Sequence, residues 1–289
     1  MLVKIWILGA GGQVGRALVD LCQGEKIPFV ASKRSDVDIT DLIRLGKEAK
    51  RIAPTHILNT AAFTDVDGAE ERFRQAHAVN ALGPENIGIV ASELGIQVVH
   101  LSTDYVFDGK KGAPYVEEDL TNPLGVYGKT KREGEVRLLE QLPTACIIRT
   151  SWVFGVQGKN FISSALSFLQ QKDQIGAVED QLNRPTYNRD LARVMIDLSC
   201  HSGIFHFANQ GVVSRFQIVC DFNEEAHLRG IPVRCQKIEP ALSKDFPAKS
   251  PRPPYSVLST KKVELTLGRK PRLWETVLGE YLDHVKSHM

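Results

Sequence analysis

The chain has 289 residues, of which 43% are hydrophobic and 24% are charged. These values are ordinary for a globular protein, and the length allows one large α/β domain with a smaller appendage. The formal net charge is only +2. Because no basic surface is expected, we exclude nucleic acid and a membrane as partners at this stage.

The five cysteines are widely scattered along the chain. They include no CxxC pair, and no group of histidines has the spacing of metal ligands. Their number is odd and the chain is not small, so we expect buried free thiols in a reducing compartment, without a disulfide framework or a metal site.

The first ten residues are apolar, but Lys4 interrupts them and a glycine turn follows where a signal peptide would have its cleavage site. No apolar stretch approaches the ~20 residues that a transmembrane helix needs. We therefore predict a cytoplasmic protein.

Short apolar segments alternate with helical patterns through the first half of the chain. The pattern predicts strands over residues 3–8, 28–31, 56–59, 98–101 and 146–149. Between the first two, Val14, Ala17, Leu18 and Leu21 recur at helical spacing. Short buried strands separated by helices are typical of a parallel sheet that is covered on both faces. We predict an α/β fold with a Rossmann-type, doubly wound parallel sheet.

After about residue 155 the alternation weakens. Residues 204–208 have the pattern of one further strand that returns to the sheet, whereas residues 240–254 are rich in Pro, Lys and Ser and are expected to be mostly irregular. We therefore predict a sheet domain over residues 1–155 and mainly a smaller C-terminal, substrate-binding lobe over residues 156–289.

Three glycines, Gly9, Gly12 and Gly15, stand between the first predicted strand and the first predicted helix. One glycine allows a tight turn, one lets backbone amides approach a pyrophosphate, and one lets the helix pack closely on the strand. The helix N-terminus then attracts the phosphates. This context predicts that residues 1–155 bind a dinucleotide. The GxxGxxG spacing favours the short-chain dehydrogenases.

The second predicted strand leads into Lys33 and Arg34, with no acidic residue at its end. NAD-binding proteins place an acid there for the ribose, and NADP-binding proteins place an Arg for the 2′-phosphate. We predict NADPH, with Arg34 as the phosphate ligand. NADH stays open, because Asp36 and Asp38 follow closely and because both cations also suit a solvated loop.

Tyr127 and Lys131 are four residues apart, which places them on one face of a helix. A nearby ammonium favours the phenolate and lowers the pKa of tyrosine from ~10 toward the working range of an acid–base catalyst. Thr103 follows the strand predicted over 98–101 and so stands at the carboxyl end of a parallel strand, where such sheets bind ligands. Taken alone, Thr103 also fits a strand-end cap.

Five segments stand in order along the chain. They are GAGGQVG at 9–15, NTAAFT at 59–64, STDYVF at 102–107, YGKTK at 127–131 and RTSWV at 149–153. Weaker matches continue around Arg184 and Arg252. Together they resemble the dTDP-4-dehydrorhamnose reductase family of extended short-chain dehydrogenases over almost the whole chain. The resemblance implies an NADPH- or NADH-dependent enzyme that reduces the C4 ketone of a dTDP-4-keto-6-deoxyhexose.

The resemblance also implies roles for single residues. Tyr127 becomes the proton donor, Lys131 binds the nicotinamide ribose, Thr103 and Asp104 hold the sugar, and Trp152 packs against it. The further cofactor ligands that it implies are Gly12, Gln13 and Val14 at the pyrophosphate, Asp38 and Ile39 near the adenine, and Ala62, Phe63 and Thr64 along the groove.

Family members usually carry His at the position of Phe63, which changes a polar contact. Arg184 and Arg252 are the candidates for the nucleotide side of the substrate. Asn80, in a predicted central helix, is a candidate for a hydrogen bond that steadies the site, although capping explains it equally well. A homodimer stays open.

Two other functions stay open as well. An epimerase or a 4,6-dehydratase acting on a nucleotide sugar shares the glycine turn and the Tyr127–Lys131 pair, although no Glu follows Asp104 as is common in the dehydratases. A non-catalytic branch resembles this family, binds NADP, and acts as a regulatory subunit of methionine adenosyltransferase.

Overall fold

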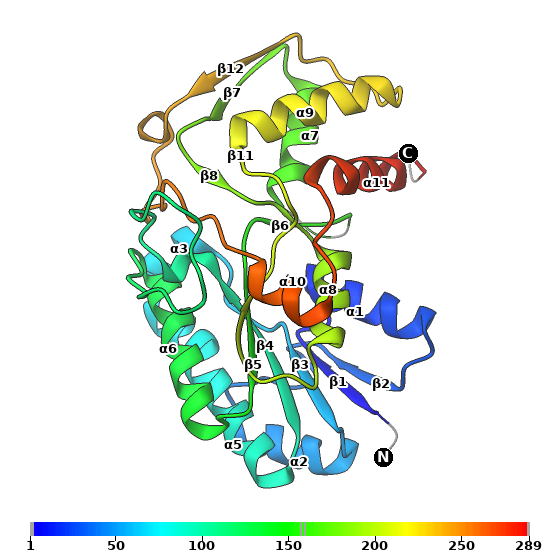
Figure 1. Cartoon of the computed structure of the whole chain (residues 1–289), viewed down its shortest axis with the longest axis vertical. Coiled ribbons are helices and arrows are strands. Elements are labelled where there is room, and N and C mark those ends of the chain that lie inside the picture. Colours follow the sequence, from blue (N-terminus) through cyan, green and yellow to red (C-terminus); the bar gives the residue numbers. More distant parts are fainter. Residues whose placement is uncertain (1–2, 157, 159, 288–289) are drawn as a thin grey trace.

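The computed structural model describes residues 3–156, 158 and 160–287. Its centre is a six-stranded parallel sheet with the order β2-β1-β3-β4-β5-β10 (Figure 1). These strands are β1 (Ile5–Leu8), β2 (Phe29–Ser32), β3 (His56–Asn59), β4 (Gln97–Thr103), β5 (Cys146–Thr150) and β10 (Gly203–His206). The predicted α/β class and parallel sheet are confirmed, and a strand lies at 203–206 beside β5.

Helices cover both faces of the sheet. Successive residues of a strand point to opposite faces, so alternate residues pack under different helices. Ile5 and Ile7 of β1 belong to the core under α1 and α8, and Trp6 and Leu8 belong to the core under α2, α5 and α6. Strands buried on both faces contain few polar residues. The covering helices are α1 (Gln13–Gly24), α8 (Asn188–Asp197), α2 (Leu42–Ile52), α5 (Gly83–Leu94) and α6 (Val126–Gln141).

The second lobe has its own core, in which Phe222, Trp274 and Tyr281 are buried. It lies above the sheet in Figure 1. It consists of α7 (Phe161–Gln171), α9 (Arg215–Leu228), α11 (Trp274–Lys286) and three small sheets that pair β7 (Gln174–Val178) with β12 (Lys237–Ala241), β6 (Val153–Phe154) with β9 (Thr186–Tyr187), and β8 (Leu182–Asn183) with β11 (Val213–Ser214). The chain leaves this lobe to form α8 and β10 on the sheet.

The remaining elements are short. They are α3 (Val66–Glu71), α4 (Phe73–His77), a π-helical turn (Ala78–Leu82), 3-10 turns at Asp104–Val106 and Ser243–Asp245, and α10 (Lys261–Leu267) beside β10. Apart from the end of β12, residues 240–254 contain one of these turns and otherwise irregular backbone, as expected.

All five thiols are free. Cys22, Cys146 and Cys235 are buried and Cys220 is half-buried, but Cys200 is exposed, so the expectation of burial is wrong for that residue. Within the described residues, every helix is too short or too polar to cross a lipid bilayer.

A buried ion pair joins α6 to the sheet. Arg149 of β5 is 1% exposed and donates two hydrogen bonds to the Glu135 carboxylate of α6, at 2.9 and 2.8 Å. Arg132 donates a third, at 3.2 Å. Such a fork satisfies both charges, whereas removal of one partner leaves the other charge buried and unpaired.

We therefore expect Glu135→Gln to lower the free energy of unfolding by about 3–5 kcal/mol. The matched control is Glu133→Gln on the same helix, because Glu133 is 38% exposed where it pairs with Arg137; its loss should be only about 0.2–1 kcal/mol. Urea denaturation of both variants measures the difference. Equal losses would show that the buried pair contributes no more than a surface pair.

Candidate active site

A cleft of about 760 Å³ opens at the carboxyl ends of β1, β3, β4 and β5. This is the point where the strand order reverses, because β2 lies on one side of β1 and β3 on the other. Most residues that were predicted to bind cofactor or substrate line the cleft, namely Gly9, Gly12, Gln13, Val14, Arg34, Asp38, Ile39, Ala62, Phe63, Thr64, Thr103, Asp104, Tyr127, Lys131 and Trp152.

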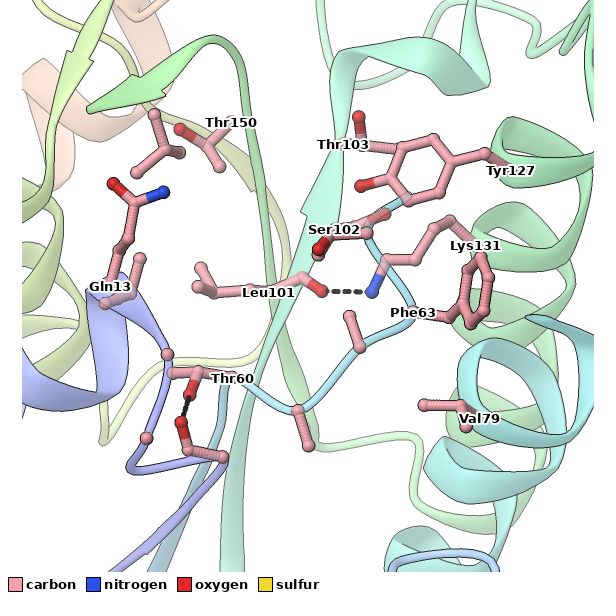
Figure 2. Close-up of a pocket in the computed structure, with 18 of the residues that line it drawn as sticks. Gln13, Thr60, Phe63, Val79, Leu101, Ser102, Thr103, Tyr127, Lys131 and Thr150 are labelled. Carbon is pink, nitrogen blue, oxygen red and sulfur yellow. Dashed lines mark hydrogen bonds between the residues drawn. The ribbon is translucent and has the colours of Figure 1, made fainter. Parts of the chain in front are cut away.

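The glycine turn forms one wall of this cleft. Gly9 has a φ of +79°, and a Cβ there would lie 2.5 Å from the Ala61 amide nitrogen. The Thr60 hydroxyl lies 2.8 Å from the Leu8 carbonyl. It also lies 3.2 Å from the Gly9 carbonyl, a contact drawn in Figure 2, and so holds the two turns together. Gly15 does not line the cleft; a Cβ there would lie 2.3 Å from the Gly9 carbonyl oxygen. Glycine is therefore required at both positions for close backbone packing.

Helix α1 begins at Gln13, so its first amides, which have no acceptor within the helix, face the same end of the sheet. Gln13 also joins the two lobes. Its side-chain oxygen accepts a hydrogen bond from Asn160 at 3.2 Å, and its carbonyl accepts one from Asn188 at 3.0 Å. The helix end therefore has contacts with both lobes.

At the end of β2, Lys33 and Arg34 both line the cleft. Arg34 is exposed, and its Nε lies 3.2 Å from an Asp38 carboxylate oxygen. Asp38 also accepts hydrogen bonds from the amide and the hydroxyl of Thr40. Arg34, the predicted ligand of the 2′-phosphate, is thus paired with Asp38, the acid that could instead bind the ribose of NADH.

Tyr127 and Lys131 lie on the first turns of α6 and point toward Thr103 and Ser102 at the end of β4 (Figure 2). The helix approaches this strand end closely because Gly128 faces the Tyr105 carbonyl oxygen, which a Cβ would meet at 2.2 Å. The sequence spacing therefore does bring the tyrosine, the lysine and the threonine together.

Burial raises the pKa of Tyr127 well above its usual range, and a hydrogen bond with the Thr103 side chain acts in the opposite direction. Tyr127 is therefore a protonated phenol at neutral pH. Lys131 donates to the Leu101 carbonyl at 2.6 Å, and the predicted lowering of the Tyr127 pKa by Lys131 stays a prediction.

Asp104 is a buried carboxylate at the base of the cleft. Its Oδ2 accepts hydrogen bonds from Asn183 at 2.8 Å and from Ser256 at 2.6 Å, and its Oδ1 accepts one from Thr103 at 3.1 Å. Burial raises the pKa of Asp104 to about 6, against these hydrogen bonds, which lower it. Asp104 therefore orients Thr103 and attaches β4 to the second lobe.

Trp152 has a φ of +42°, a left-handed conformation that is unfavourable for a bulky residue. Its ring lines the cleft, and the Arg215 guanidinium lies 4.6 Å from the ring centroid. Arg215 also donates to Gln181 and is hydrogen-bonded to Tyr105. Within the described part of the chain it forms no ion pair. The sequence did not single out Arg215, because nothing near position 215 resembles a motif.

Arg184 and Arg252 do not line the cleft. Arg184 donates to the Leu258 carbonyl and to Thr260, each at 3.3 Å. Arg252 donates to Asp67 at 3.0 Å, and its guanidinium lies 5.8 Å from the Tyr105 ring centroid. Their predicted contact with substrate therefore stays a prediction, which the lining of the cleft does not support.

Two further residues complete the site, namely Asn80, which was predicted as a candidate for a steadying hydrogen bond, and Ser102, whose role was not predicted. Asn80 lies in the π-helical turn, accepts from the Phe63 amide at 2.8 Å and donates to the Phe63 carbonyl at 3.1 Å, so it holds the loop that lines the cleft. The Ser102 hydroxyl is buried, lines the cleft and has no hydrogen-bond partner among the described residues. A buried hydroxyl of this kind is available to a ligand.

A family model and full-length relatives identify the family of this chain. The family model described as RmlD substrate binding domain matches residues 3–287. The dTDP-4-dehydrorhamnose reductase of Aggregatibacter actinomycetemcomitans is 34% identical over 286 residues, which cover 96% of this chain and 97% of the relative. This chain belongs to the dTDP-4-dehydrorhamnose reductase family.

Solved structures of family members have the same fold. The crystal structure of a dTDP-4-dehydrorhamnose reductase from Clostridium acetobutylicum is 36% identical, with a TM-score of 0.92 over 98% of this chain and 100% of that one. The enzyme from Bacillus anthracis, solved in complex with NADP, is 29% identical, with a TM-score of 0.92 and the same coverage. The predicted family, fold class and nucleotide-sugar ketoreductase class are confirmed.

The close packing of the glycine turn yields a test. Gly15→Ala should lower the free energy of unfolding by about 1–3 kcal/mol, because the new methyl group meets backbone atoms that cannot move separately. The control is Gly24→Ala in the same helix, where a Cβ has nothing within 4 Å; it should be neutral or slightly stabilising. Thermal and urea unfolding measure both, and an undisturbed Gly15→Ala protein would contradict the packing.

Proposed function

We propose that this chain reduces the C4 ketone of a dTDP-4-keto-6-deoxyhexose, converting dTDP-4-dehydrorhamnose to dTDP-rhamnose with NADPH. The observation that carries the proposal is the meeting of Thr103, Tyr127 and Lys131 at the carboxyl end of β4, in the same cleft as the glycine turn. The balanced reaction consumes one ketone, one NADPH and one proton, and yields one alcohol and one NADP⁺.

The residues in the cleft fit a dinucleotide. Gly9, Gly11 and Gly12 line the cleft at the start of α1, where phosphates can meet backbone amides. Asn80 holds the loop that follows β3, and the orphan Ser102 hydroxyl can meet a polar group of the ligand. Lys33 and Arg34 provide positive charge where the 2′-phosphate of NADPH would lie. When bound, NADPH supplies the hydride for the ketone carbon. NADH remains the alternative, through Asp38.

Tyr127 donates the proton to the sugar oxygen as negative charge develops on it. Its raised pKa suits this role, because the phenol stays protonated at neutral pH until an anionic oxygen forms beside it. The Thr103 hydroxyl is held toward Asp104 in this structure and can turn to the same oxygen. Lys131 holds a ribose hydroxyl beside the tyrosine.

The sugar lies against Trp152, whose indole provides a flat apolar surface. Arg215 does not itself line the cleft, but it is stacked on that indole and has no acidic partner among the described residues, so it is a candidate cation for the diphosphate of the substrate. The geometry offers less support for Arg184 and Arg252, which bind protein groups outside the cleft.

Other functions of the superfamily are separated by a simple measurement. An epimerase or a 4,6-dehydratase returns its cofactor unchanged, and a regulatory subunit of methionine adenosyltransferase would bind NADP and its partner without turnover. Net oxidation of NADPH with enzymatically prepared dTDP-4-keto-6-deoxy sugar supports the reductase. A cytoplasmic location and a homodimer stay predictions, the latter tested by light scattering.

The central test is Tyr127→Phe. We expect kcat to fall by about 100-fold or more, because the general acid is lost, while the Kd for NADPH stays close to that of the unchanged protein. Stopped-flow absorbance of NADPH measures the first quantity and fluorescence titration the second. A Phe variant with nearly full kcat would remove Tyr127 from the role of proton donor.

The cofactor preference is tested by Arg34→Gln. Loss of one charge-assisted contact to the 2′-phosphate should raise the Kd for NADPH about tenfold and leave the Kd for NADH unchanged. Arg44→Gln, at an exposed position of α2, is the control for a general loss of positive charge. Equal effects on both cofactors would show that Arg34 is only a solvated residue of the loop.

A further inference from the structure

A chain of hydrogen bonds runs behind Lys131, on the side away from the cleft. The Ala61 amide donates to the Asn59 side-chain oxygen at 3.1 Å. The Asn59 side-chain nitrogen lies 2.8 Å from His100 Nδ1, and His100 Nε2 lies 3.3 Å from Lys131 Nζ. Asn59 and His100 are opposite each other in the register of β3 and β4, and are 0% and 1% exposed.

The hydrogen bond from the Ala61 amide determines which group donates and which accepts at each later step of this series of hydrogen bonds. A backbone N–H can only donate, so the atom of Asn59 that faces Ala61 must be the oxygen, and the NH₂ group must face His100. Nδ1 of His100 then accepts, which places the single proton of the neutral ring on Nε2. The opposite orientation of Asn59 would bring two buried donors together at Ala61 and leave them unsatisfied.

The Nε2–H group of His100 therefore points toward Lys131. A neutral amine has a lone pair that can accept this hydrogen, whereas an ammonium has three donors and no acceptor. Lys131 meanwhile donates to the Leu101 carbonyl at 2.6 Å, which either form can do. The imidazole thus interacts favourably with the amine and unfavourably with the ammonium.

We propose that Asn59 and His100 are positioning residues for the reduction, which hold a hydrogen-bond donor against Lys131 and so favour its neutral amine. They act through Lys131 and do not line the cleft. The inference about their role in turnover rests on the proposed function, but the proton position on His100 does not. Its consequence is a lysine that can release a proton near neutral pH, beside the tyrosine that must be reprotonated after each turnover.

The surrounding charges agree with this arrangement. Burial lowers the pKa of Lys131 to about 8, and Glu135, one turn further along α6, acts in the opposite direction. Glu135 is itself engaged by Arg149 and Arg132, which limits its pull on Lys131. Burial and the charge of Lys131 hold the pKa of His100 well below its usual range, so the ring stays neutral while Lys131 titrates.

The proton position can be measured directly in the full chain without substrate. Isotope-labelled histidine gives ring-nitrogen chemical shifts that distinguish the two tautomers, and His100 is assigned by the signal that is missing in His100→Gln, or by single replacements of the other histidines if that variant does not fold. We expect the Nε2–H tautomer between about pH 6 and 9, outside the range where a buried ring becomes charged. The Nδ1–H tautomer or a protonated ring would overturn the proposal.

The second test is a variant that exchanges donors and acceptors along this series of hydrogen bonds. In Asn59→Asp the carboxylate accepts from both Ala61 and His100, so the ring proton moves to Nδ1 and Nε2 becomes an acceptor for the ammonium. The pKa of Lys131 should then rise by about one unit or more, a change of about tenfold in the ratio of the two forms. Gln97→Glu, which adds the same charge at the exposed start of β4, should leave it unchanged.

Two readouts follow the change. Labelled lysine reports the titration of Lys131 in the protein alone, and the pH profile of kcat reports it in turnover, where the fall in rate on the alkaline side should move to higher pH in Asn59→Asp. Because the new carboxylate also raises the pKa of Lys131 by its charge alone, the decisive readout is the tautomer of His100 in Asn59→Asp, and an unmoved ring proton or an unmoved titration would refute the proposal. Absence of ketosugar reduction with the expected tautomer would refute the proposed function instead.

Discussion

The close approach of two turns at the ends of β1 and β3 determines where everything else in the site can lie. Gly9 leaves no room for a side chain against Ala61, and the Thr60 hydroxyl binds the carbonyl that precedes the glycine turn. This contact places the start of α1 beside the loop that follows β3, and Asn80 holds the other side of that loop through the Phe63 amide. This wall of the cleft is therefore formed by backbone atoms, whose positions do not depend on side-chain rotamers.

Burial then gives the polar groups of the cleft their chemical character. It raises the pKa of both Tyr127 and Asp104 and lowers that of Lys131, so each group is moved toward its uncharged form. A site with reduced charge before the ligands arrive can respond strongly when an oxygen anion forms in it, because few mobile charges or water molecules screen the interaction. Protein hydrogen bonds, rather than ion pairs, hold these three residues in place.

The sequence alone predicts the sheet because its strands are buried on both faces and are therefore almost wholly apolar. It also predicts the glycine turn and the Tyr127–Lys131 pair, since both depend on spacing within one short segment. It does not reveal the crossing of α8 and β10 back to the sheet domain in detail, the stacking of Arg215 on Trp152, or the position of His100 behind Lys131. Each of these contacts joins segments that are far apart in the chain, and a local sequence pattern does not predict such contacts.

The part of the cleft that we propose to hold the sugar depends on the second lobe. Thr103 is oriented by Asp104, and the Asp104 carboxylate is held by Asn183 of β8 and by Ser256. At the opposite end of the cleft, Gln13 is bound by residues that follow β6 and β9. A shift of the second lobe would therefore alter the orientation of Thr103 and the start of α1 together. The second lobe, which we propose to contact the substrate, therefore also orders the end of the sheet at which the cleft opens.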